Sequence, residues 1–394
     1  MNNDRLLFNR KLHIIFCITM IAVMEVSIIS PVLPTIASSL NLTSKQANLM
    51  IVFFTMPGIF LSPFMGIAGD RFGRKKVLVP SLLIFGTCGS LCFFVNDFKL
   101  ILMLRFLQGT GAASLGSLNQ TVIGDVFPGK ERIIAMGYNS TVLSMGTMLY
   151  PAIGGAVALI GWHYPFLVSL LAFPVAALVT FSLDNPEPAK NGKIGQYLKE
   201  SLALLKTKQT VALYFTTFAT FTMLYGIILA FYPYYIKGHF AASPFLTGIV
   251  LSSSSIGSMI GSFNMGRFSG MSSSKRMMIA AFIFYIVSLG IAFVTPAALL
   301  FVIPVMLYGF ANGILIPNIQ TQLSIIAPME YRGAFMSLNS TMLRAGQTVG
   351  PLLSGIILAG AGENYVFITG AVFALFVIFV IARAVPDMGN LEVK

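Results

Sequence analysis

Charged side chains are scarce in this chain of 394 residues, where Asp, Glu, Lys and Arg together make up only 10%. Soluble globular proteins carry about 25%, so this composition excludes a soluble enzyme and a disordered protein. There is one Trp, and there are only three Cys and three His. The cysteines lie in apolar runs without metal-ligand spacing, which excludes a disulfide scaffold. We therefore expect no metal and no cofactor.

Catalytic residue sets are also missing from the sequence. His13, His163 and His239 lie near the ends of apolar runs, no Ser/His/Asp set accompanies them, and there is no phosphate-binding loop. We expect a protein that is not an enzyme.

Apolar sequence is what the chain has in abundance. Hydrophobic residues make up 56% of it, with 34 Phe and 36 Gly, and a helix needs about 20 apolar residues to cross a bilayer. The sequence therefore predicts an all-α integral membrane protein. Its twelve transmembrane helices are expected over residues 12–35, 46–68, 77–95, 99–122, 133–159, 164–183, 209–236, 243–266, 276–295, 298–321, 333–359 and 364–384.

One polar stretch with two prolines and five lysines, residues 184–208, divides the chain almost in half. We predict an N-terminal six-helix bundle over 1–183, a cytoplasmic linker over 184–208 and a C-terminal six-helix bundle over 209–394. The first apolar run, of about 22 residues, is too long for the core of a signal peptide, so it is expected to remain as the first span.

The net charge of +12 follows the predicted loops. With the N-terminus in the cytoplasm, 20 of the 25 basic residues fall in cytoplasmic segments, three fall outside, and Arg105 and Arg344 fall within spans. This asymmetry is the positive-inside pattern, so it predicts a multi-pass protein of the cell membrane with both termini cytoplasmic. The charge therefore indicates a lipid bilayer as partner and no nucleic acid. We expect a monomer.

The two halves repeat one another at an offset of 200 residues. The Asn-Ser-Thr triplet at 139–141 recurs at 339–341, and Gly146, Pro151 and Gly155 recur as Gly346, Pro351 and Gly355. Because six helices is an even number, both copies enter the membrane in the same sense. The repeat therefore predicts two pseudo-symmetric bundles, with a small-molecule substrate at their interface near the midplane.

The loop at 66–76 reads GIAGDRFGRKK. It resembles the signature loop of the major facilitator superfamily, and the whole chain resembles the twelve-span drug:proton antiporters of bacterial multidrug efflux. The resemblance implies that Arg74 pairs with Asp125, at the inner end of the fourth helix, and so latches the outward-facing state. The implied latch consists of Gly66, Asp70, Arg71, Gly73, Arg74 and Asp125. The alternative is a plain positive-inside loop.

Two charged residues in predicted spans match further family motifs. Glu25 is the only carboxylate well inside a span, and Arg105 lies in a segment, LRFLQGTGAA, that resembles the family's fourth-helix motif. The resemblance implies that Glu25 is the proton site and that Arg105 assists proton transfer. The alternatives are an acid hydrogen-bonded to a neighbouring helix and an arginine that snorkels to the interface. The repeat aligns Glu25 with Tyr225, which cannot carry a proton in the same way.

The segment at 146–155, GTMLYPAIGG, resembles the family's antiporter motif. Gly146, Gly154 and Gly155 would allow close helix approach, and Pro151 would bend the helix. Tyr150 replaces the glycine that usually precedes the proline, which weakens the inference of antiport.

The expected cavity would be lined by polar and aromatic side chains of several helices. As substrate-binding residues we predict Glu25, Asn119, Tyr225, Tyr232, Tyr308, Asn312 and Arg344. Arg344 could bind an anionic substrate or reach the inner interface.

The leading functional hypothesis is an exporter of small amphipathic, drug-like compounds in exchange for protons. The alternatives are a proton-coupled exporter of one metabolite class (a siderophore, sugar or amino-acid derivative) and, remotely, a membrane sensor that does not transport.

Overall fold

The structure is a computed structural model that describes residues 9–127, 129–183, 207–327 and 332–387. Within helices of these ranges a few side chains, among them those of Glu25 and Asp70, lie outside the described part. Every regular element in the described ranges is helical. The N-terminal half contains α2 (Arg10–Ile29), η1 (Ser30–Val32), α3 (Leu33–Ser39), α4 (Ser44–Phe72), α5 (Arg74–Leu91), η2 (Cys92–Phe94), α6 (Phe98–Val126), α7 (Gly129–Val157), α8 (Tyr164–Leu167), η3 (Val168–Leu171) and α9 (Ala172–Ser182).

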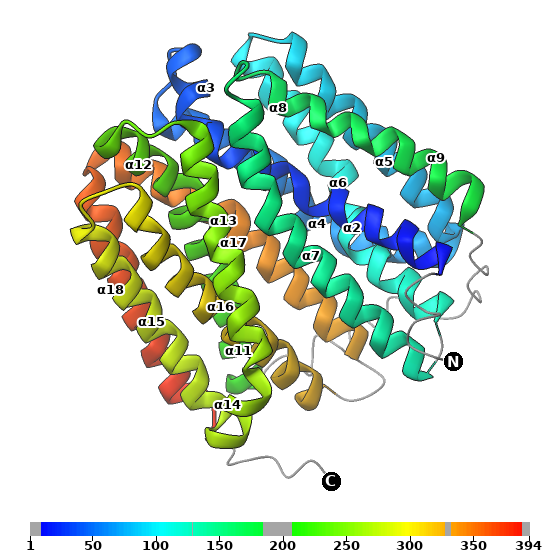
Figure 1. Ribbon diagram of the computed structural model, residues 1–394. Coiled ribbons are helices and arrows are strands. Elements are labelled where there is room, and N and C mark those ends of the chain that lie inside the picture. Colours follow the sequence, from blue (N-terminus) through cyan, green and yellow to red (C-terminus); the bar gives the residue numbers. More distant parts are fainter. Residues whose placement is uncertain (1–8, 128, 184–206, 328–331, 388–394) are drawn as a thin grey trace.

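The C-terminal half repeats this pattern of long helices (Figure 1). It contains α11 (Lys208–Met223), η4 (Leu224–Phe231), α12 (Tyr232–Phe240), α13 (Pro244–Phe263), α14 (Met265–Met271), α15 (Ser274–Val294), η5 (Leu299–Phe301), α16 (Val302–Ile326), α17 (Arg332–Gly360) and α18 (Glu363–Ala384). η4 is a π-helix that continues directly from α11 into α12. The predicted linker at 184–208 lies almost entirely outside the described residues.

Short polar side chains set where several of these helices begin. The side chains of Thr43, Asp97, Ser243 and Ser273 each accept a hydrogen bond from a backbone N–H in the first turn that follows. Such caps satisfy donors that have no partner within the helix. The capped helices begin within a few residues of the span boundaries that the sequence predicts.

The described residues include nine helices that are long and apolar enough to cross a membrane, and the bent segment of α2, η1 and α3 would make a tenth. α6 and α7 are each 29 residues long but are not among the nine. The all-helical fold is thus confirmed, while the number of twelve spans stays a prediction.

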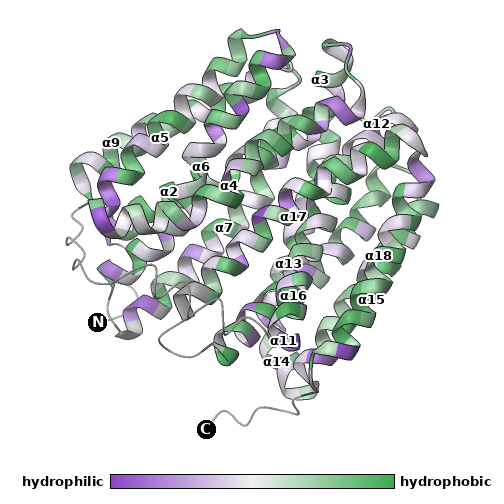
Figure 2. Ribbon diagram, turned by 180° about the vertical axis from the view of Figure 1, so that it is seen from behind, coloured by the Kyte–Doolittle hydropathy of each residue, from purple (hydrophilic) through white to green (hydrophobic). Residues whose placement is uncertain are grey.

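Most of the ribbon is coloured hydrophobic in Figure 2, and many of the hydrophilic residues lie toward its two ends. Large apolar side chains are exposed on many of the helices. On α18, for example, Ile368, Val372, Leu375 and Phe379 form an exposed stripe with helical spacing. Residues spaced in this way lie on one face of a helix. Two separate buried cores lie inside, the first built mainly from α2 to α9 and the second from α11 to α18.

Two helix pairs pack most extensively across the two halves, α4 with α17 and α7 with α13. In Figure 1 all four helices run through the middle of the molecule, between the blue-to-green half and the green-to-red half. This seam between the halves contains the candidate site.

Candidate functional site between the two halves

Glycines bring the backbones of the two halves into direct contact along the seam. A methyl carbon added at Gly155 on α7 would lie 2.2 Å from the carbonyl oxygen of Pro244 on α13. One added at Gly248 on α13 would lie 2.2 Å from the carbonyl oxygen of Pro151. A methyl carbon added at Gly154 would lie equally close to the carbonyl oxygen of Ile28 on α2. The segment at 146–155 therefore packs backbone against backbone on two neighbouring helices, one from each half.

Hydrogen bonds join the halves at the same end. Ser30 donates to the carbonyl oxygen of Leu229 at 2.5 Å, and Asn48 donates to that of Pro351 at 3.3 Å. The ammonium group of Lys237, on α12, donates to the carbonyl oxygen of Pro34 at 3.2 Å. We call this end, marked by Lys237, the closed end.

The opposite end, marked by Asp125, is the open end. A methyl carbon added there at Gly66, Gly137 or Gly266 would have no heavy atom within 4 Å of it, outside its own helix backbone. These glycines lie on α4, α7 and α14, elements that form or adjoin the seam. The contacts named above between the halves thus lie toward the closed end, and these three glycines make no close contact at the open end.

A polar group lies between the halves at the middle of the seam. Arg344 Nη1 donates to Gln347 Oε1 at 3.0 Å, and Gln347 Nε2 donates to the hydroxyl of Tyr225 at 2.8 Å. Closer to the closed end, the hydroxyls of Thr55 and Thr348 are 2.9 Å apart, one from each half. Among the predicted site residues, the structure thus places Arg344 and Tyr225 together at the seam.

Arg344 lies too deep to reach either end of its helix. It is 12 residues from the start of α17, or about 18 Å at 1.5 Å per residue. Its partner Gln347 is one helical turn away, and the sequence analysis missed it. The spacing of three residues on one helix was the available signal.

Arg105 is completely buried, in the part of α6 nearer the closed end. Its Nε donates to the carbonyl oxygen of Met50 at 3.2 Å, and its Nη1 donates to Gln108 Oε1 at 3.0 Å. The guanidinium carbon lies 4.5 Å from the ring centre of Phe54. Arg105 therefore ties α6 to α4 inside the N-terminal half and does not snorkel to the surface.

Asn119 is buried in a hydrogen-bonded group that joins three helices of the N-terminal half. Its amide donates to the hydroxyl of Thr19 on α2, which donates to Asn139 Oδ1 on α7. The C-terminal half contains the matching bond from Thr217 to Asn339 Oδ1 at 2.7 Å. Asn119 thus stabilises the packing of α2, α6 and α7.

This matching bond corrects the alignment of the two halves. Thr217 follows Thr19 by 198 residues, whereas Asn339 follows Asn139 by 200. Between the first helix of each half the offset is therefore 198, which aligns Glu25 with Met223 instead of Tyr225. A methionine cannot carry a proton either.

Three other predicted substrate contacts lie inside the C-terminal core. Tyr232 packs against Phe301, with ring centres 4.9 Å apart, and Tyr308 stacks on Tyr285 at 4.2 Å. Asn312 accepts a hydrogen bond from the Tyr285 hydroxyl at 2.6 Å. Tyr232 and Tyr308 are 0% exposed and Asn312 is 4% exposed. The expectation that these residues line a cavity therefore disagrees with their burial, because they face α15 and α18.

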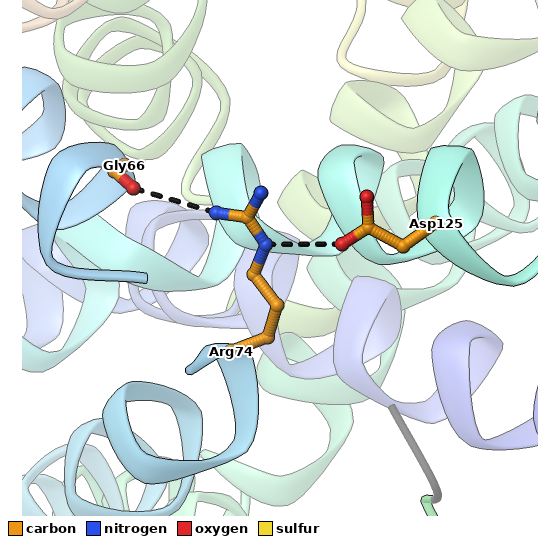
Figure 3. Close-up of polar contacts among 3 residues, drawn as sticks. All are labelled: Gly66, Arg74 and Asp125. Carbon is orange, nitrogen blue, oxygen red and sulfur yellow. Dashed lines mark hydrogen bonds and ion pairs between the residues drawn. The ribbon is translucent and has the colours of Figure 1, made fainter. Parts of the chain in front are cut away.

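The residues of the expected latch lie at the open end (Figure 3). Arg74 Nε, on α5, contacts Asp125 Oδ2 on α6 at 3.1 Å, and Arg74 Nη1 donates to the Gly66 carbonyl oxygen at 3.4 Å. Gly73 has a φ of +96°, which suits glycine. Arg71 is exposed, and the side chain of Asp70 lies outside the described part.

The Arg74–Asp125 ion pair joins two helices of the same half. By itself this ion pair therefore does not hold the two halves in one relative position.

Replacing Asp125 by alanine is expected to lower the stability of the N-terminal half by about 2 to 3 kcal/mol, because it leaves the buried Arg74 without this partner. Thermal unfolding of the purified protein measures the effect. Asp387→Ala is the matched control, because its partner Arg276 is 71% exposed; we expect a loss below about 1 kcal/mol there. Equal losses in the two variants would contradict the prediction.

A model of one protein family, described as Major Facilitator Superfamily, matches residues 15–238 and 213–392. The chain belongs to the major facilitator superfamily. As a member of this superfamily it is a multi-pass membrane transporter and not an enzyme.

Individual relatives agree with this assignment. Multidrug resistance protein 2 of Bacillus subtilis (strain 168) is 26% identical over 356 residues, which are 86% of each chain. The bacillibactin exporter of the same organism is 36% identical over 147 residues, so the match spans only 37% of that exporter and 36% of this chain. A crystal structure of a mutant of the nucleoside transporter NupG has a TM-score of 0.81 and covers 96% of this chain and 100% of its own, at 14% identity. At that identity the likeness concerns the fold alone.

Proposed function

We propose that this major facilitator protein exports small amphipathic organic compounds in exchange for protons, by alternating access. The observation that carries the proposal is the polar centre at Arg344, Gln347 and Tyr225. It lies at the seam between two halves whose close backbone contacts are at the closed end. The relative named multidrug resistance protein 2, aligned over 86% of both chains, supports the direction of transport.

The proposed orientation places the open end in the cytoplasm. That end carries the basic cluster Arg71 to Lys76, whereas the loops of the closed end carry few basic residues. Positive charge favours the cytoplasmic side. The described conformation is then the one that loads substrate from the cytoplasm.

Glu25 is the proposed proton site. A carboxyl group within a span can take up a proton on one side of the membrane and release it on the other. One such group implies about one proton per cycle, and each charge that moves is worth about 2.3 kcal/mol per 100 mV.

Glu25→Gln is expected to reduce substrate-dependent proton flux at least tenfold, because the amide cannot be protonated and deprotonated as a carboxylate can. The flux is followed by pyranine fluorescence inside proteoliposomes after addition of ethidium, dansylglycine or dansylglycinamide. Glu363→Gln is the control, since this carboxylate pairs with His239 at the surface of the closed end. Undiminished flux in Glu25→Gln would overturn the proton-site assignment, and absence of any flux in the wild type would overturn antiport.

A second candidate is an exporter dedicated to one class of metabolite. Two observations favour it: the partial match to the bacillibactin exporter and the presence of a cation, Arg344, in the central site. A binding screen that finds one class of ligand among many chemically distinct compounds would support this candidate over a broad exporter.

A further inference from the structure

Arg344 faces the other half of the transporter across the seam. A methyl carbon added at Gly58 on α4 would lie 3.1 Å from Arg344 Cδ, and one added at Gly116 on α6 would lie 3.6 Å from Arg344 Nη2. Both neighbours belong to the N-terminal half and have no side chain. The guanidinium group therefore lies against two glycines, where side chains of other residue types would occupy the space.

The direction of the Arg344 side chain is fixed by its own half. Gln347 accepts from Nη1 and is itself held by the Tyr225 hydroxyl. Tyr225 lies on the π-helix η4, and π-helical turns occur often at functional sites. The ring of Phe221, 6.4 Å from that of Tyr225, provides apolar surface beside this group.

The charge of Arg344 has no acidic partner within the described part of the chain. Arg74 and Arg276, by comparison, contact aspartates at 3.1 and 3.5 Å. Arg344 instead donates to a neutral amide, although its side chain is half-buried near the middle of a long helix. A charged residue in such a place needs a counter-charge or water, and water is removed when the two halves close around a substrate.

We propose that Arg344 anchors a negatively charged group of the transported molecule, such as a carboxylate, sulfonate or phenolate. The assignment rests on the proposed function, because it names the substrate class of the same central site. An arginine guanidinium offers paired donors that match such an anion. Arg344 then supplies the selectivity for charge, Gln347 holds it in position, and Phe221 and Tyr225 contact the apolar part of the molecule. Export of a monoanion in exchange for a proton moves two elementary charges in the same electrical direction, so transport is electrogenic.

Dansylglycine and dansylglycinamide test the proposal, because they differ only in a carboxylate that becomes a carboxamide. Their binding to the full-length protein in nanodiscs is measured by dansyl fluorescence, without any gradient. We expect the wild type to bind dansylglycine at least tenfold more tightly than the amide. Arg344→Gln should bind both compounds with the affinity of the amide, and Arg344→Lys should keep part of the preference.

Arg276→Gln is the matched control, because it removes one positive charge from an exposed site and should behave as the wild type. Thermal unfolding shows whether each variant is folded, and the wild-type preference is itself independent of any variant. The proposal is overturned if the wild type does not prefer dansylglycine, or if the preference survives in Arg344→Gln. Because binding is measured at equilibrium, this result does not depend on proton coupling or on the direction of transport, which the flux experiment tests.

Discussion

Replacing Gly155 by alanine is expected to reduce transport at least tenfold. The added carbon would lie 2.2 Å from the backbone oxygen of Pro244, where neither side can give way by a side-chain rotation. Relief requires α7 and α13 to separate, which destabilises the closed end. Overpacking of this kind costs about 1 to 3 kcal/mol, and about 1.4 kcal/mol changes a conformational equilibrium tenfold.

Gly137→Ala is the matched control on the same helix. A methyl carbon there has no atom within 4 Å outside the local helix backbone, so only the gain in helix propensity remains, about 1 kcal/mol. Both substitutions raise propensity equally, and only Gly155→Ala should lose substrate flux in proteoliposomes. Distances between spin labels on α3 and α12 should lengthen in Gly155→Ala alone. Normal flux with unchanged distances would show that the glycine contact is dispensable.

Replacing Arg105 by alanine is expected to destabilise the protein by about 3 to 5 kcal/mol. The substitution leaves the carbonyl group of Met50 and the amide of Gln108 without the bonds they make to the guanidinium group, and it removes a completely buried side chain. Unpaired buried polar groups and cavities are among the most destabilising changes known in proteins. Thermal unfolding in detergent measures the loss.

Arg71→Ala serves as the comparison for Arg105. Arg71 is exposed at the open end and lies 5.8 Å from the Phe72 ring, so its loss should change stability by less than about 0.5 kcal/mol. If Arg105→Ala unfolded at the temperature of the wild type, the buried network could not be what joins α4 to α6.

The fold could be predicted from the sequence because a lipid environment restricts the options. Long apolar runs can only be helices in a membrane, and caps such as Thr43 and Asp97 mark where helices start. The repeat at 200 residues identified two halves. The shift to 198 between Thr19 and Thr217 was not recognised, because it follows from side-chain pairing and the two threonines are embedded in different local sequences.

The sequence could identify only those site residues that stand out by their type and by their position within a predicted span. Arg105 and Arg344 were singled out because charge is expensive within a span. The expected cavity residues Tyr308 and Asn312 instead face the core, because Gly309 and Gly313 on the same helix pack against α13 and so turn the polar face toward α15. Which face a uniformly apolar helix presents to a neighbour depends on packing, and composition does not contain that information.

The contacts at the closed end also determine how its opening depends on ionic strength. In the part of the chain that the structure describes, glycine–carbonyl contacts and hydrogen bonds join the halves, and no ion pair crosses between them. Added electrolyte screens exposed charges but leaves short-range packing unaffected. Opening of this end should therefore be insensitive to ionic strength.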